Sequence, residues 1–219
     1  MAARFPLPNG AVLEIARVIG SAVAFTALTN AKPPVATAAD HAIQNGDVLL
    51  VNSGWARIND RAVKASGVGE DVFALAGLDT SDAEFFTAGA GVGSVLPVSD
   101  WVQISKVTSF NSAGGEQQYA TVGYLEDDDD KQFPTNRNPT SLTIIVEDQP
   151  TAAYIESVEG YDASKELTVI RMKLRNGDQI LYPGYVSITT DPTMERNNVM
   201  TRTISVGLSA RSLRYLAGA

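Results

Sequence analysis

Short runs in which apolar and polar residues alternate recur along this chain, whereas helical spacing is scarce. The run 11–18 alternates in this way and follows a Pro8-Asn9-Gly10 turn, so a strand is expected near the start. Alternation of period two is typical of half-buried strands. Further strand candidates, alternating or continuously apolar, lie at 48–51, 72–75, 101–107, 119–125, 141–146 and 201–208. The chain is therefore predicted to be mainly β.

The clearest hairpin is expected where residues 166–175 and 179–188 flank an Asn176-Gly177 pair. Asn-Gly favours a type I′ turn, in which both residues have a positive φ. One face of the first strand holds Thr168, Ile170, Met172 and Leu174, and the other holds Val169, Arg171, Lys173 and Arg175. We expect one face to lie in the core and the other to meet solvent or another subunit.

One short helix is expected at 150–158. Asp148 is the predicted N-cap, Pro150 falls in the first turn, and Gly160 is predicted to end the helix. The apolar positions that share one face are Ala153, Tyr154 and Val158. The helix is therefore predicted to pack on a sheet.

Residues 21–100 differ in texture from the rest of the chain, being rich in Ala, Gly and Ser. Asn45-Gly46-Asp47 predicts a tight turn that feeds a buried strand. The series Gly89, Gly91, Gly93 precedes an extended run, so it predicts a turn and not a phosphate-binding loop. We predict a core formed by residues 1–20 and 101–219, interrupted by a small all-β module at 21–100.

The 219 residues carry a formal net charge of −8 and include no cysteine. Disulfides and thiolate chemistry are excluded, so stability must come from core packing or oligomerisation. Because DNA binders hold phosphates with Lys and Arg, a chain of this charge is not expected to grip DNA, although a passive conduit benefits from weak adhesion. No apolar run approaches the ~20 residues of a membrane span, so we expect no membrane insertion, and we expect synthesis in the cytoplasm.

Catalytic chemistry finds little support in the sequence. His41 is the only histidine, and neither a G-x-S-x-G elbow nor a G-x-x-x-x-G-K-[ST] loop occurs. A hydrolase that uses two carboxylates needs two buried acids in a cleft, and the acids of this chain have the pattern of exposed residues. We expect no enzyme activity, no catalytic residue and no cofactor.

An acidic run lies within a long polar segment at 113–139. Its members are Glu126, Asp127, Asp128, Asp129 and Asp130. The run lacks the alternating ligands of a calcium loop, so a solvated loop is favoured over a metal site. Because hairpin connections usually take ~2–5 residues, the segment is predicted to serve function, to be mobile in the monomer and to become ordered against basic residues of another subunit. The basic candidates are Arg171, Lys173, Arg175, Arg196 and Arg202.

Seven segments after residue 100 follow one another in an order and spacing that can be compared with known families. They are Trp101–Val107, Tyr124–Asp130, Ser141–Val146, the expected helix around Tyr154, Met172–Asp178, Tyr182–Ser187 and Thr201–Val206. In this order and spacing, the second half of the chain resembles the major tail tube proteins of long, non-contractile-tailed (siphovirus-type) bacteriophages. The resemblance implies a tail-tube β-sandwich or barrel flanked by one α-helix.

The same resemblance implies how the protein works. Copies would form homo-hexameric rings that stack into the tail tube of the virion, a conduit for ejection of the phage DNA without sequence-specific binding. A hairpin loop would reach the adjacent ring, and its contact residues are expected to be Tyr124, Leu125, the acidic run and Phe133. The tape measure protein inside the tube, the tail terminator and the distal tail proteins would be further partners.

Residues 21–100 resemble small β modules that recur in phage tail proteins. The matching motifs are Asn30-Ala31-Lys32-Pro33-Pro34-Val35, His41–Val48 and Asn59-Asp60-Arg61, with Pro34 as an added residue.

An alternative function for the chain is that of a carbohydrate- or receptor-binding β module, for which Trp55, Tyr182 and Tyr185 would have to gather on one exposed face.

Overall fold

The structure is a computed structural model that describes residues 10–217, so Pro8 and Asn9 of the expected first turn lie outside the described residues. Its elements in chain order are β1 (Val12–Ile19), β2 (Val23–Phe25), β3 (Ala27–Leu28), β4 (Val35–Thr37), β5 (Val48–Ser53), β6 (Ala62–Ser66), β7 (Val72–Ala76), β8 (Gly93–Ile104), β9 (Val107–Gly114), β10 (Gln117–Val122), β11 (Lys131–Arg137), β12 (Thr140–Glu147), α1 (Ala153–Ser164), β13 (Thr168–Lys173), β14 (Gln179–Ile188), β15 (Thr201–Leu208) and β16 (Leu213–Tyr215). The prediction of a mainly β chain with one flanking helix is confirmed.

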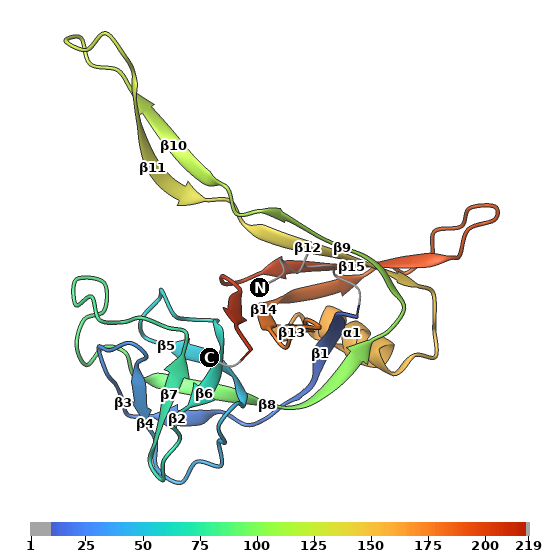
Figure 1. The fold of residues 1–219 in the computed structure, drawn as a ribbon, viewed down its shortest axis with the longest axis horizontal. Helices are drawn as coiled ribbons and strands as arrows, with labels where there is room; N and C mark the ends of the chain where they lie inside the picture. The colour runs from blue at the N-terminus through green and yellow to red at the C-terminus, as the bar shows by residue number, and fades with distance from the viewer. Residues whose placement is uncertain (1–9, 218–219) are drawn as a thin grey trace, which may run out of the picture.

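The strands form one antiparallel path and one separate ribbon (Figure 1). The path runs β3-β4-β7-β6-β5-β8-β1-β13-β14-β15-β12-β9, with β16 added to β14 and β2 added to β8. It does not close on itself, so β3 and β9 are its two ends. The ribbon is β10–β11, which pairs with no other strand of residues 10–217.

Two large hydrophobic clusters lie at opposite ends of the path. One is formed by residues between Phe25 and Val95 and includes Trp55, Phe73 and Leu75. The other is formed by β1, the second half of the chain and one face of α1. In this second cluster Tyr154, Ile155 and Val158 of α1 pack with buried isoleucines of β12, β13 and β15.

Strand β8 belongs to both ends of the path. Residues 93–97 pair with β5 and β2, whereas residues 98–104 pair with β1. The prediction that a strand begins at Trp101 is therefore wrong at its start, because Gly93–Ile104 is one continuous strand. It also ends earlier than expected, since Lys106 takes a left-handed φ of 55° before β9 begins.

A third hydrophobic cluster connects the two ends of the strand path. It lies where β8 passes from one end to the other. Val48 and Leu50 of β5 and Ala62 of β6 are buried together with Val169 of β13 and Leu181 of β14. The second face of the β13–β14 hairpin, which was expected to meet solvent or another subunit, is thus partly covered by residues of the same chain. The sequence pattern showed an apolar Val169 on that face but could not show what covers it.

The turn between β13 and β14 differs from the predicted type I′ turn. The Gly177 N–H donates to the Leu174 carbonyl at 2.9 Å, and the Leu174 N–H donates to Asp178 O at 2.8 Å. Of the turn residues 175–177, only Gly177 has a positive φ, of 91°. This geometry is a longer loop with a left-handed glycine after its turn, the next most common hairpin type after the two-residue loops.

The helix also differs from its predicted limits. It runs from Ala153 to Ser164, its N-cap is Ala152 without a side-chain hydrogen bond, and Lys165 ends it with a φ of 57°. Gly160 lies inside the helix, and Ala153 is exposed while Ile155 is buried. Packing of Tyr161 in the last turn against the second cluster accounts for the extension past Gly160, because tertiary contacts outweigh the ~1 kcal/mol cost of a helical glycine.

Candidate assembly surface

The predicted loop at 113–139 is largely a regular hairpin. Strands β10 and β11 pair from Gln117↔Arg137 to Val122↔Lys131, and Pro134 lies opposite Tyr119. Proline discourages regular strand pairing, because it has no backbone N–H to donate. It is tolerated because a two-stranded ribbon has free edges on both sides, so the absent N–H need not break a ladder bond.

This ribbon projects far from the rest of the molecule (Figure 1). Every residue of β11 is exposed, and so are the large side chains Tyr119, Tyr124 and Phe133. Leu125 at the tip is 110% exposed. Because an isolated two-stranded hairpin is marginally stable in water, a ribbon with these apolar side chains indicates a surface for a partner.

The acidic run forms the tip of the ribbon. Asp127 pairs with Lys131 at 2.5 Å, and the Lys131 ammonium lies 5.5 Å from the centre of the Tyr124 ring. Among residues 10–217 this is the only ion pair that the run makes, and no group of three or more His, Asp or Glu in that range is placed to hold a metal ion. The tip therefore carries a net negative charge that the rest of the described chain does not neutralise.

Two of the predicted basic residues are already paired within the chain. Glu14 of β1 lies opposite Arg171 of β13 in the strand register. Its carboxylate accepts from Arg171 at 2.6 Å and from Lys173 at 2.9 Å, and the Arg171 guanidinium lies 3.9 Å from the centre of the Trp101 ring. Arg171 and Glu14 are each only 15% exposed, so neither presents a free charge to another subunit.

The other predicted basic residues lie in different places. Arg202 is buried, donates to Thr189 O at 2.8 Å and pairs with Glu159 at 3.3 Å. Arg175 is exposed in the β13–β14 turn, and Arg196 is exposed in the 189–200 loop, which projects on the other side of the molecule (Figure 1). The structure does not bring the five basic candidates into one surface, and it gathers none of them with the acidic tip in a single chain.

The aromatic residues of the carbohydrate-binding alternative do not share an exposed face. Trp55 is 4% exposed, packs edge-on to Phe86 and donates from Nε1 to Thr87 O at 2.9 Å. Tyr182 packs with Phe110, and only Tyr185 is exposed. The geometry gives this alternative no stacking platform.

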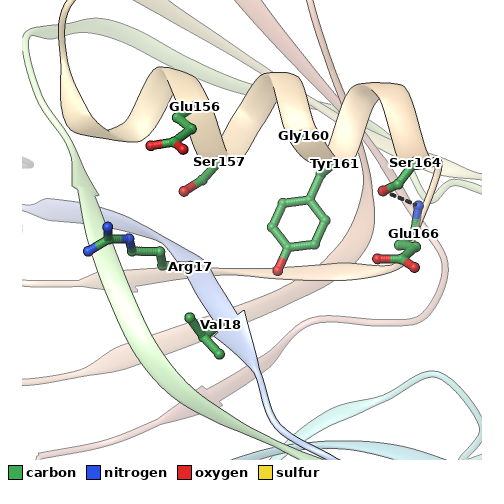
Figure 2. Close-up of a pocket in the computed structure, with 8 residues that line it drawn as sticks. All are labelled: Arg17, Val18, Glu156, Ser157, Gly160, Tyr161, Ser164 and Glu166. Carbon is green, nitrogen blue, oxygen red and sulfur yellow. Dashed lines mark hydrogen bonds between the residues drawn. The ribbon is translucent and has the colours of Figure 1, made fainter.

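A shallow pocket of about 430 Å³ lies between α1 and the end of β1 (Figure 2). Glu156 and Glu166 line it, but both are exposed, and the Ser164 hydroxyl accepts only a weak 3.4 Å bond from the Glu166 N–H. Among residues 10–217 the buried acid is Asp178, which accepts from the Ala217 N–H at 2.9 Å and pairs with Arg214 at 2.5 Å. These hydrogen bonds hold the pKa of Asp178 below its usual range.

The last strand fastens the C-terminal segment to the other end of the path. Strand β16, which no sequence signal predicted, pairs with β14. The Tyr215 hydroxyl accepts from the Lys64 N–H at 2.9 Å and donates to Ala76 O at 2.8 Å. Burial raises the pKa of Tyr215 to about 12.

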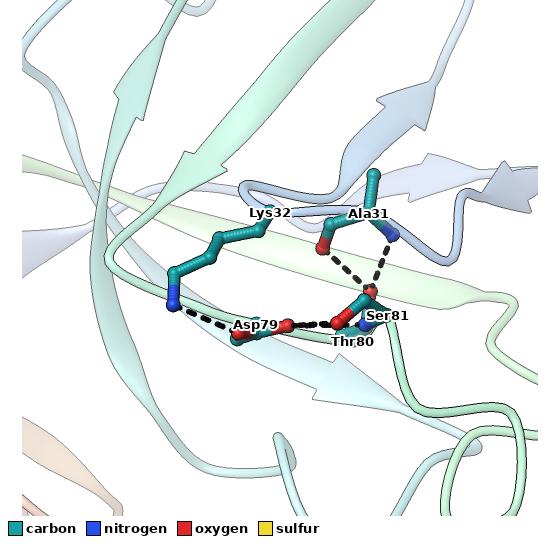
Figure 3. A network of polar contacts seen from close by, with 5 residues as sticks. All are labelled: Ala31, Lys32, Asp79, Thr80 and Ser81. Atoms are coloured by element: carbon teal, nitrogen blue, oxygen red, sulfur yellow. Dashed lines mark hydrogen bonds and ion pairs between the residues drawn. The ribbon is translucent and has the colours of Figure 1, made fainter.

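A polar network closes the loops of the 21–100 region (Figure 3). The Thr80 hydroxyl accepts from the Ala31 N–H at 3.2 Å and donates to Thr29 O at 2.9 Å. Asp79 pairs with Lys32 at 2.9 Å and accepts from the Ser81 hydroxyl at 2.6 Å. These hydrogen bonds, with that from Ser81 the largest contribution, lower the pKa of Asp79 to about 2.

Comparison with known protein families connects this surface to a function. Residues 53–217 match the family model described as "Phage tail tube protein, TTP". The chain belongs to this phage tail tube protein family. The match begins at Ser53, so it includes the second half of the 21–100 region as well as the segments recognised after Trp101.

Solved tail structures resemble this tail tube protein at low identity. A chain of the virion of a native gene transfer agent particle has 11% identity and a TM-score of 0.41, over 52% of this chain and 88% of that one. A chain of the tail of an empty gene transfer agent particle, determined by helical refinement with C6 symmetry, has 11% identity and a TM-score of 0.42, over 55% and 88%. A chain of the cap that terminates the anti-feeding prophage tube has 16% identity and a TM-score of 0.38, over 52% and 83%. No curated protein sequence matches the chain.

The family match supports a structural role in a phage tail and a place in the virion. The single helix of residues 10–217 has 12 residues and is too short and too polar to cross a membrane.

Proposed function

We propose that six copies of this tail tube protein form a ring and that rings stack into the tube of a long non-contractile tail, through which the phage DNA is ejected. The observation that carries the proposal is the β10–β11 ribbon, an exposed element that carries the apolar side chains of Tyr119, Tyr124, Leu125 and Phe133 on a chain of the tail tube family. A partner that covers the ribbon would explain why it carries exposed apolar side chains. In a homopolymer that partner is another copy of the chain.

The open ends of the sheet support a ring. Strand β9 has β12 on one side, and its last four residues, Asn111–Gly114, are exposed. An unpaired strand edge presents N–H and C=O groups that can pair with another chain. We propose that edges of neighbouring subunits join in this way around an inner barrel, which removes the liability of the open edge.

The ribbon tip supports contact between rings. It would meet the adjoining ring through the eight predicted contact residues, Tyr124, Leu125, Glu126, Asp127, Asp128, Asp129, Asp130 and Phe133. Of the predicted basic partners, the exposed Arg175 and Arg196 make no ion pair among residues 10–217, whereas Arg171, Lys173 and Arg202 are paired with Glu14 and Glu159.

The net charge of −8 supports a passive conduit. Weak repulsion between an acidic lumen and DNA allows the DNA to slide without adhesion. We propose that the tape measure protein occupies this lumen before ejection, and that the tail terminator and distal tail proteins close the two ends of the tube.

The hydrophobic cluster between Phe25 and Val95 supports a division into a core of residues 1–20 and 101–219 and a module of residues 21–100. We propose that this module lies on the outside of the tube, where its bulk blocks neither the channel nor the joint between rings. The buried contact of Leu50 with Val169 and Leu181 indicates that the module is docked on the core and does not swing on a linker.

Negative-stain electron microscopy of the purified protein, with sedimentation velocity over a range of concentrations, tests the proposal. Rings with six-fold symmetry or tubes of uniform diameter are expected as concentration rises. A chain that remains monomeric in sedimentation, alone and with a preparation of tail terminator or distal tail protein as nucleus, would falsify the ring model.

A further inference from the structure

Three arginines converge on one pocket of the 21–100 region. Arg57 and Arg61 come from the β5–β6 connection, and Arg211 comes from the β15–β16 connection. We call this the arginine pocket; it has a volume of about 320 Å³ and is lined by Arg57, Ile58, Arg61, Leu78, Asp79, Phe86 and Arg211. Ile58, Leu78 and Phe86 are buried and give it an apolar base beneath a cationic rim.

The positive charge of this pocket is not neutralised within the described chain. Among residues 10–217 neither Arg57, Arg61 nor Arg211 makes an ion pair within 4 Å, and the Arg57 guanidinium lies 3.5 Å from the centre of the Phe85 ring. The carboxylate at the pocket, Asp79, is held by Lys32 and Ser81 (Figure 3).

The three arginines differ in exposure: Arg57 and Arg211 are exposed, whereas Arg61 is half-buried. Burial, followed by the like charge of Arg211, lowers the pKa of Arg61, which is about half buried. Cationic groups are held close together and partly out of water only at a cost, and a bound anion offsets that cost. In a protein of net charge −8, three unneutralised arginines around one pocket mark a binding site for an anion.

We propose that the arginine pocket receives the acidic tip of the β10–β11 ribbon from a second copy of this chain. The proposal rests on the tube assembly proposed above and names the partner surface of the ribbon. Glu126, Asp128, Asp129 and Asp130 make no ion pair within residues 10–217, so they are available to the three guanidinium groups, which bind carboxylates in two-pronged pairs.

The apolar part of the tip fits the same site. Leu125 is fully exposed and directly precedes the acidic residues in the sequence. The pocket has a matching composition, because buried apolar residues line it together with the arginines. Insertion of Leu125 against Ile58 and Leu78 would bury apolar surface while the acids meet the rim. Neither Arg175 nor Arg196 offers this combination, because each is a single exposed charge on a turn or loop.

Disulfide trapping tests the contact, because the chain has no cysteine of its own. Ser212 is exposed and adjoins Arg211, whereas Val199 is exposed in the loop of Arg196. The double variant L125C/S212C places one thiol at the tip and one at the pocket, and the matched variant L125C/V199C tests the rival site. Both are oxidised mildly at assembling concentration and separated on a non-reducing gel.

We expect L125C/S212C to give a ladder of covalent oligomers, with a cross-linked fraction at least tenfold above that of L125C/V199C. The variant R57E/R211E in the L125C/S212C background is expected to remove the ladder, and D128K/D129K added to it to restore the ladder. A ladder from L125C/V199C alone, or from neither pair, overturns the proposal.

Microscopy of the same samples separates this proposal from the ring model. A ladder without rings upholds the pocket contact and removes the ring model. Rings without an L125C/S212C ladder overturn the pocket contact and leave the ring model intact.

Discussion

The hydroxyl of Tyr215 accepts a hydrogen bond from the backbone N–H of Lys64 across 151 positions of sequence. It also donates to Ala76 O, so one side chain near the C-terminus satisfies two backbone groups of β6 and β7. The C-terminal segment is therefore a fastening between the core and the 21–100 region, together with the buried cluster around Leu50 and Val169.

The first prediction concerns this fastening. Tyr215→Phe keeps the ring but leaves the Lys64 N–H and the Ala76 carbonyl without their partner. We expect a loss of about 1–2 kcal/mol of unfolding free energy and a Tm lower by roughly 2–8 °C. Calorimetry measures the change, and Tyr185→Phe, at an exposed tyrosine, is the control that should leave Tm unaltered.

The same tyrosine predicts a pH dependence. Its pKa in the folded chain is raised to about 12 from 10.0, so the folded state holds the phenol proton more tightly than the unfolded state. The stability from this group is fully present below pH 10 and is lost as pH rises from 10 to 12. The Tm difference between the parent and Tyr215→Phe should therefore shrink over that window, and a difference that grows would contradict the assignment.

The third prediction concerns Glu14, which holds both Arg171 and Lys173. Glu14→Gln leaves two half-buried cations facing each other, and we expect a loss of about 2 kcal/mol in unfolding free energy from urea titration. Asp100→Asn is the matched control, because Asp100 pairs with Arg17 at 3.6 Å on the exposed surface and such pairs contribute little. Equal effects of the two substitutions would show that the Glu14 cluster contributes no more than a surface pair.

The fourth prediction concerns the acidic tip. Replacement of Asp127, Asp128, Asp129 and Asp130 by Asn should leave Tm nearly unchanged, because the one ion pair lost is partly exposed. Tube growth, followed by light scattering, should slow or stop, and high salt should weaken assembly of the parent chain in the same direction. The control variant E70Q/D71N/D82N/E84Q also removes four exposed acids and should assemble like the parent.

The fifth prediction concerns the 21–100 region, which we expect to be dispensable for ring formation but not for the stacking of rings, because it carries Arg57 and Arg61 of the arginine pocket. The deletion is best spliced between Gly20 and Pro97, because these residues already lie side by side: the Gly20 N–H donates to Pro97 O at 2.7 Å. A Gly/Ser turn in place of residues 21–96 exposes Val169 and Leu181, so Val169→Thr and Leu181→Thr should accompany it. A shortened chain that folds but forms no rings would show that the region is part of the contact within a ring, and one that still forms tubes would show that the arginine pocket is not needed for stacking.

The sequence predicted best those elements whose pattern is complete within one segment. Strand β15 has the predicted limits 201–208 because its alternation is uninterrupted, and the β13–β14 hairpin has a glycine at the required left-handed position. The limits of α1 were missed because the packing of Tyr161 outweighs the helix-ending tendency of Gly160.

Contacts between residues that are far apart in the sequence could not be predicted. The partner of Arg171 is Glu14, 157 positions away, and only the strand register places the two side chains together. The arginine pocket likewise combines residues of two connections that have no common motif. Period-two alternation reveals that a residue faces one side of a sheet, but it carries no information about which strand lies beside it.

Strand β8 has a mechanical consequence. It is hydrogen-bonded along its length to β5 at one end and to β1 at the other, so a pull on the 21–100 region along the strand loads many backbone bonds in shear, simultaneously. A pull across the strand would instead peel them one by one. A force applied to the 21–100 region parallel to β8 would thus be transmitted into the rest of the sheet and would not strip the region from it.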